Sequence, residues 1–199
     1  MDLFIQQLLA GLAVGGIYAS LALALVMIYQ ATSLVNFAQG EMAMFSTYLA
    51  WSLIQQGMPY WAAFFLTLAI SFAGGVLIER LVIRPARNAP VLSIVIIFIG
   101  LLVILNSVAG WIWTYTNQIM PSPFPDRSFQ GVNIQELGAI GVTLVVLALV
   151  FAFFRFTPLG LAMRAAAQNP TSSRLVGIRV GWMLALGWGL AAAIGASAG

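Results

Sequence analysis

Apolar runs of roughly membrane-spanning length recur along this chain, and short polar segments separate them. The hydrocarbon core of a bilayer is about 30 Å thick, and a helix needs about 20 apolar residues to cross it. Six runs meet or approach this length, at 8–28, 42–54, 61–78, 91–110, 137–154 and 182–199. The pattern therefore predicts an all-α fold, a polytopic transmembrane helix bundle of about six spans in a single domain, 1–199.

The second run is the shortest, and two interpretations of the segment 37–54 stay open. It either crosses the membrane fully from near Phe37 or re-enters it as a piece buried within protein. Asn36 and Gln39 have the spacing of a capping box, so a helix is expected to begin there. Glu41 then lies in the first turn, where the helix dipole favours a negative charge. It is either a charge at the inner interface or a buried group near a transport path.

The composition supports a membrane protein and excludes several kinds of chemistry. Hydrophobic residues make up 62% of the chain and charged residues only 7%, whereas a soluble domain carries about 25% charged residues. The sequence contains no cysteine, histidine or lysine. A disulfide, a histidine-based metal site, a Ser-His-Asp triad and a GxxxxGK[ST] phosphate loop are therefore all excluded. We expect no catalytic residue and no metal site here.

The arginines indicate topology rather than nucleic-acid binding. The net charge is +3, and all but one of the arginines gather in two segments, 79–90 and 155–181. Positive residues favour the cytoplasmic side, so both segments are predicted to be cytoplasmic and 111–136 to be external. The N-terminus is then external, provided that the second run crosses fully. An aromatic belt at the outer surface is predicted from Trp111, Trp113 and Tyr115.

Glycine pairs with GxxxG spacing occur in the first and last runs. Gly11 and Gly15 form one pair, and Gly195 and Gly199 form the other. Small residues at this spacing let membrane helices approach closely. We therefore expect helix packing at both pairs, with a role in forming a pathway as the alternative.

The segment 155–181 is longer than a connection between two spans requires. Residues 159–167 suit a short amphipathic helix, which Asn169-Pro170 would end. Thr171 or Ser172 can begin a second helical turn. This segment is either an interfacial helix lying on lipid headgroups or a docking site for another protein.

Three motifs in order resemble the permeases of ATP-binding-cassette importers for branched-chain amino acids. The first is GLAVGGIYASLALAL at 11–25 followed by NFAQGE at 36–41, with Gln39 where the family more often has histidine. The second is ERLVIRPAR at 79–87, which is similar to a cytoplasmic loop of the family. The third is TPLG at 157–160, then RA at 164–165 and LVGI at 175–178, which resembles its coupling loop. Together they cover nearly the whole chain.

The resemblance implies a translocation subunit, without enzymatic activity, in a larger importer. Such permeases span the inner membrane several times and work in pairs, with a second permease subunit. They bind two ATP-binding subunits, which hold ATP and magnesium, and an external substrate-binding protein, so no cofactor is expected in this chain. The usual substrates are leucine, isoleucine and valine, and relatives carry urea, short amides or other amino acids. Members of the family are longer, so we expect this sequence to be the N-terminal part of a longer protein.

The resemblance also assigns candidate residues to the expected coupling, loop and pathway positions. Coupling to the ATPase is expected in 155–181, at Leu159, Gly160, Arg164, Gln168, Asn169 and Gly177. The other cytoplasmic loop is expected to place Glu79, Arg80, Arg84, Pro85 and Arg87. Weaker candidates for the pathway are Tyr18, Asn36 and Glu41. The external segment 111–136 is expected to contact the binding protein.

Two other classes of protein remain as alternatives. A channel or secondary carrier would work without an ATPase, but a carrier is expected to break helices at matching places in two halves. One candidate break is visible, near 36–40. A membrane enzyme is poorly supported, because no acid pair has catalytic spacing and the usual nucleophiles and bases are missing.

Overall fold

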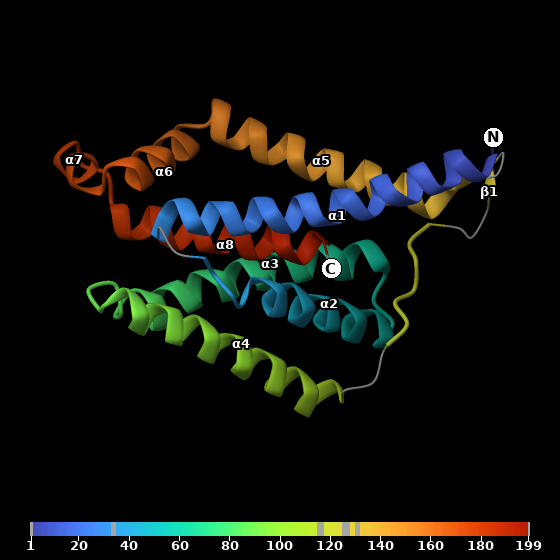
Figure 1. Ribbon diagram of the computed structural model, residues 1–199, viewed down its shortest axis with the longest axis horizontal. Coiled ribbons are helices and arrows are strands. Elements are labelled where there is room, and N and C mark those ends of the chain that lie inside the picture. Colours follow the sequence, from blue (N-terminus) through green and yellow to red (C-terminus); the bar gives the residue numbers. More distant parts are fainter. Residues whose placement is uncertain (1, 33–34, 115–117, 125–127, 130–131, 199) are drawn as a thin grey trace.

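The computed structural model describes residues 2–32, 35–114, 118–124, 128–129 and 132–198, which form a bundle of long helices with one small hairpin (Figure 1). The predicted belt residue Tyr115 and the glycine-pair residue Gly199 lie outside the described residues. The helices are α1 (Asp2–Thr32), α2 (Gln39–Gln55), α3 (Tyr60–Ile78), α4 (Val91–Trp113), α5 (Ile134–Phe156), α6 (Pro158–Gln168), α7 (Pro170–Leu175) and α8 (Val180–Ala198). A π-helical turn, η1 (Glu79–Ile83), continues α3, and the strands β1 (Ser128–Phe129) and β2 (Val132–Asn133) pair antiparallel.

Five of the described helices are long and apolar enough to cross a membrane: α1, α3 with η1, α4, α5 and α8. With α2 they match the six predicted runs, so the predicted all-α membrane bundle is confirmed. α2 has 17 residues, which at 1.5 Å per residue extend only about 25 Å. That length is less than the roughly 30 Å thickness of the hydrocarbon core.

Proline and capping residues explain where several helices begin. Pro59 and Pro90 immediately precede α3 and α4, and both have the extended backbone typical of a residue outside a helix. Thr157 caps α6, where its hydroxyl accepts a hydrogen bond from the backbone N–H of Gly160 at 3.0 Å. Asn169 ends α6 and caps α7 through the N–H of Ser172 at 3.0 Å. The predicted helix–Asn-Pro–helix arrangement is therefore confirmed, with α7 beginning at Pro170.

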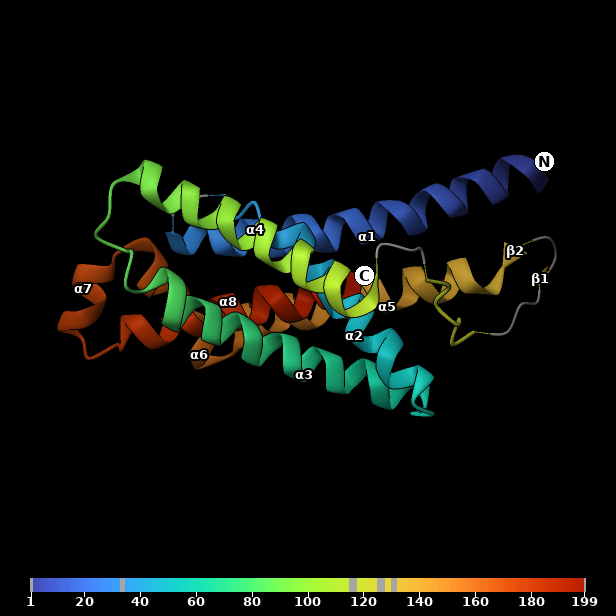
Figure 2. The ribbon, with the colours of Figure 1, turned by 90° about the horizontal axis from the view of Figure 1, so that it is seen from below.

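α8 is the central helix of the bundle. It packs against α1, α2 and α3, and it lies between α1 and α3 in the turned view (Figure 2). Trp188 of α8 is fully buried and stacks on Phe98 of α4, with ring centroids 6.0 Å apart. By contrast, α5 has no buried residue among those described, so most of its surface is free to face lipid or another chain.

A close helix approach lies between α3 and α8, not at the predicted glycine pair of α1. A Cβ added to Gly75 would come within 2.5 Å of the backbone oxygen of Trp188. Nothing in the described chain lies within 4 Å of a Cβ added to Gly11 or Gly15, so the predicted packing there is not found within this chain. Gly16 beside them does pack, against Thr143 of α5.

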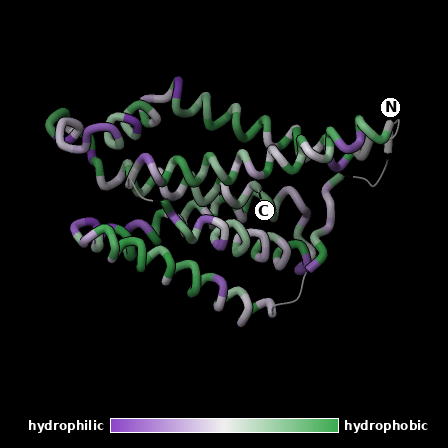
Figure 3. Tube along the Cα trace, in the orientation of Figure 1, coloured by the Kyte–Doolittle hydropathy of each residue, from purple (hydrophilic) through white to green (hydrophobic). Residues whose placement is uncertain are grey.

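The polar segments gather at the two ends of the long axis. α6, α7 and the turn between α3 and α4 lie together at one end, which we call the arginine-rich end (Figure 1). The N-terminus and the β1–β2 hairpin lie at the opposite end, with apolar helix between (Figure 3). The two arginine-bearing segments thus share one side of the bundle, as the topology prediction requires.

Candidate translocation face and coupling surface

α2 begins inside the bundle rather than at its end. Gln39, its first residue, is buried, and its side-chain N–H donates to the backbone oxygen of Ala191 at 3.3 Å. Ala191 lies about 17 Å along α8 from its first residue, Val180, at 1.5 Å per residue. Of the described non-helical residues that lead into α2, Asn36 and Ala38 are buried in protein, where irregular backbone is tolerated in a membrane, whereas Val35 and Phe37 are exposed.

Asn36 stabilises this break, but not through the predicted capping box. Its side-chain oxygen accepts from the N–H of Ala38 at 3.1 Å, and its amide donates to Gln39 at 3.5 Å. Ala38 is the N-cap, and no side chain caps the helix. The prediction that a helix begins near Asn36 and Gln39 is confirmed, with Gln39 as its first residue. The reciprocal side-chain-to-backbone pairing is wrong, because Gln39 turns instead towards α8.

Glu41 is partly exposed on the side of the bundle and is paired across helices. Its carboxylate accepts a hydrogen bond from the side-chain amide of Asn106 on α4 at 3.2 Å. Trp113, at the far end of α4, donates to Ser52 of α2 and marks the level of the predicted aromatic belt. From that level, Asn106 lies about 10 Å and Glu41 about 16 Å further in, at 1.5 Å per residue. Both positions are well within a core about 30 Å thick.

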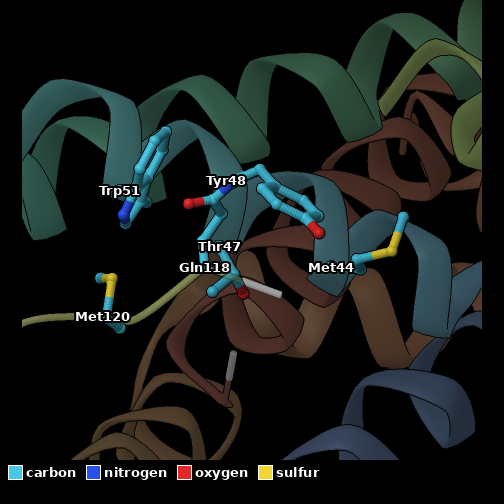
Figure 4. Close-up of a pocket in the computed structure, with 6 residues that line it drawn as sticks. All are labelled: Met44, Thr47, Tyr48, Trp51, Gln118 and Met120. Atoms are coloured by element: carbon cyan, nitrogen blue, oxygen red, sulfur yellow. The ribbon is translucent and has the colours of Figure 1, made fainter. Parts of the chain in front are cut away.

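A hollow of about 300 Å³ lies along α2, beginning at Met44, one helical turn after Glu41. The α2 residues that line it are at helical spacing, and Gln118 and Met120, from the connection after α4, line it as well (Figure 4). Apolar and aromatic groups predominate, with two hydroxyls, from Thr47 and Tyr48, and one amide. The lining residues are Met44, Thr47, Tyr48, Trp51, Gln118 and Met120. Tyr48 is held by stacking on Trp113, with centroids 5.4 Å apart.

The third pathway candidate, Tyr18, is not brought together with Asn36 and Glu41. Its side chain is two-thirds exposed on α1, whereas Asn36 and Glu41 make their hydrogen bonds to α2 and α4. The sequence analysis missed Asn106 and the lining of the hollow. Asn106 is an isolated amide near the end of the apolar run 91–110, and this is a signal that could have been used.

The predicted loop 79–87 is partly helical, and it is anchored in the core. Glu79 is fully buried in η1 and forms an ion pair with Arg87, whose side chain is 29% exposed. The guanidinium carbon of Arg80 lies 3.4 Å above the ring of Trp182, a cation–π contact that ties η1 to the start of α8. Arg84 and Pro85 are exposed at the turn that follows.

The predicted coupling segment forms α6 and α7 at the arginine-rich end, and we call the exposed surface of these two helices the ledge. Gly160 is buried where α6 packs on α5, so it holds the helix in place rather than offering a contact. Leu159, Arg164, Gln168 and Asn169 are exposed. Gly177, also exposed, has φ +85°, a left-handed conformation suited to glycine at the end of α7.

Comparison with known proteins identifies the group to which this architecture belongs. The family described as the branched-chain amino acid transport system / permease component matches residues 7–199. The chain belongs to this permease family.

Individual relatives agree with the family match over nearly the whole chain. This permease is 29% identical to the high-affinity branched-chain amino acid transport system permease protein LivH of Salmonella typhimurium, over 98% of this chain and 69% of that protein. It is 30% identical to the corresponding BraD protein of Pseudomonas aeruginosa, with the same coverage. It is 31% identical to a probable LivH of Methanocaldococcus jannaschii, over 90% of this chain and 60% of that protein. No solved structure matches. The permease is thus a multi-pass membrane protein of a transport family.

Proposed function

We propose that this permease is a translocation subunit of an ATP-driven importer for branched-chain amino acids in the inner membrane. The observation that carries the proposal is the family match across residues 7–199, together with relatives named as permeases for these substrates. In this proposal a second permease subunit completes the pathway, separate chains bind and hydrolyse ATP, and an external protein delivers the substrate.

The ledge formed by α6 and α7 is the proposed contact with the ATP-binding subunit. Leu175 and Val176 at the end of α7 are 85% and 76% exposed, which is unfavourable for apolar side chains unless a partner covers them. Arg174 and Arg179 lie beside them in sequence, and Arg164 lies on the exposed face of α6. Two exposed apolar side chains with arginines near them suit a complementary groove on a cytoplasmic protein.

The packing of α8 supports a mechanical route from this ledge to α2. α6 packs on α8 through its buried face, and α8 follows α7 after only a short connection that contains Gly177. α8 in turn carries Ala191, the acceptor for Gln39 at the buried start of α2. A displacement of α6 and α7 would therefore move α8, and with α8 the buried start of α2 that precedes Glu41, because rigid helices transmit motion in transporters.

Affinity purification tests the proposed assembly. The full-length gene product would be tagged, extracted from its native membrane in a mild detergent, and its co-purifying proteins identified by mass spectrometry. We expect an ATPase with a phosphate-binding loop and a second permease. Recovery of this protein alone, or only as a homo-oligomer, would favour a channel or carrier and refute the proposal.

A further inference from the structure

The Glu41–Asn106 pair lies at membrane depth on a side of the bundle that this chain leaves open. Asn106 is exposed, Glu41 is partly exposed, and nothing in the described chain lies within 4 Å of a Cβ added to Gly40 beside them. Glu41 is also the acidic residue of the first turn of α2. An ionisable group at this depth is expected to face a bundle interior or a water-filled path, not lipid.

The surroundings of the pair distinguish it from a structural ion pair. Glu79, the carboxylate at the arginine-rich end, is fully buried and paired with an arginine. Among the described residues, the hydrogen-bond partner of Glu41 is a neutral amide, so that contact does not balance its negative charge. A carboxylate oriented by an amide is a good acceptor for an organic cation. The hollow, lined by apolar, sulfur-containing and aromatic side chains, begins at Met44, one helical turn after Glu41.

We propose that Glu41, oriented by Asn106, binds the ammonium group of a substrate amino acid part-way through the membrane. The hollow lined by Met44, Tyr48 and Trp51 accommodates its aliphatic side chain on the way to this site. Flexible thioethers and aromatic rings suit branched aliphatic groups of varied shape. The inference rests on the proposed function for its substrate class, and it assigns that class to a particular carboxylate.

The chain contains no cysteine, so single cysteines can report on the charge and accessibility of the site. Gly40→Cys, beside the pair, in the complete importer in sealed vesicles, would be treated with membrane-impermeant cationic and anionic thiosulfonates. Gln56→Cys, at the exposed end of α2, supplies the reference for the intrinsic reactivity of the two reagents. We expect the ratio of the cationic to the anionic reaction rate to be at least about tenfold higher at this cysteine than at Gln56→Cys, because Glu41 attracts the cationic reagent.

Adding Glu41→Gln to Gly40→Cys should abolish this preference without abolishing the reaction itself. Leucine should protect the cysteine, whereas the 2-hydroxy analogue of leucine, which lacks the ammonium group, should not. An unreactive cysteine, an absent charge preference, or equal protection by the two compounds would overturn the proposal. The charge preference is measured without any substrate, so a failure of the site and a failure of the proposed function can be told apart.

Transport provides an independent readout. Glu41→Gln should reduce leucine uptake by at least about tenfold while the co-purified subunits remain at wild-type levels, and Glu41→Asp should restore part of the activity. Asp2→Asn, at the first residue of α1, is the control for loss of a carboxylate and should leave uptake within about twofold of wild type. Wild-type uptake by an assembled Glu41→Gln importer would contradict the proposal.

Discussion

The contact between α3 and α8 predicts opposite effects for two adjacent glycines. In Gly75→Ala, the added methyl carbon would lie 2.5 Å from the backbone oxygen of Trp188 and 2.8 Å from the Cβ of Ala192. Neither atom is at the end of a flexible side chain, so the helices themselves must separate, by roughly 0.7 Å if a carbon–oxygen contact of about 3.2 Å is to be reached. In Gly74→Ala, the methyl meets nothing within 4 Å.

The expected energies follow from this geometry. Overpacking of a well-packed core costs about 1–3 kcal/mol, and replacing glycine by alanine within a helix recovers up to about 1 kcal/mol. Gly75→Ala should therefore lower the free energy of unfolding by about 1–2 kcal/mol. Gly74→Ala retains only the helix term, so its stability should be unchanged or slightly higher.

Thermal unfolding of the purified protein in detergent measures the difference, with tryptophan fluorescence as the signal. Trp188 lies at the contact itself and is fully buried, so it reports directly on helix separation. About 2–4 °C per kcal/mol is typical for a chain of this size, so Gly75→Ala should melt about 2–8 °C below wild type. Equal midpoints for Gly75→Ala and Gly74→Ala would refute the close approach of α3 and α8.

Three further predictions concern the arginine-rich end. Arg164→Glu should reduce recovery of the ATP-binding subunit at least about fivefold in the purification, because it reverses the charge on the exposed face of α6; unchanged recovery would rule out docking there. Arg87→Gln should lower the free energy of unfolding by about 3–5 kcal/mol, because it leaves the buried carboxylate of Glu79 without its ion-pair partner. Glu79→Gln should lower it by less, because Arg87 reaches solvent. Equal losses in the two variants would contradict the burial argument. Gly177→Ala and Gly57→Ala, at φ +85° and +90°, should each cost about 1–2 kcal/mol in the same assay, but only Gly177→Ala should slow leucine uptake. Equal uptake by the two alanine variants would contradict a role for the α7–α8 connection in coupling.

Local signals were sufficient to predict most of the helices. The hydrophobic runs predicted the spans because membrane helices satisfy their own backbone and need only sufficient apolar length. Pro158 and the Asn169-Pro170 pair act on the residues beside them, so α6 and α7 were predicted close to their observed bounds.

Contacts between distant residues explain what the sequence did not reveal. The depth of α2 depends on the bond from Gln39 to Ala191, which are 152 residues apart. GxxxG spacing marks small residues without indicating a partner, and the close approach lies at Gly75 rather than at Gly11. Glu79 was expected in a loop, but the π-helical turn and Arg87 allow its burial. The partner of Glu41 came from another helix, and no local pattern indicates such a pair.

ATP-dependent uptake of leucine tests the central proposal most directly. The assembly purified through this permease would be reconstituted in sealed vesicles with its substrate-binding protein, and labelled leucine would be supplied with ATP or with a non-hydrolysable analogue on the cytoplasmic side. The proposal predicts that leucine accumulates against its gradient only with hydrolysable ATP. Uptake that proceeds equally without ATP hydrolysis, or an active assembly that does not carry leucine, isoleucine or valine, would contradict it.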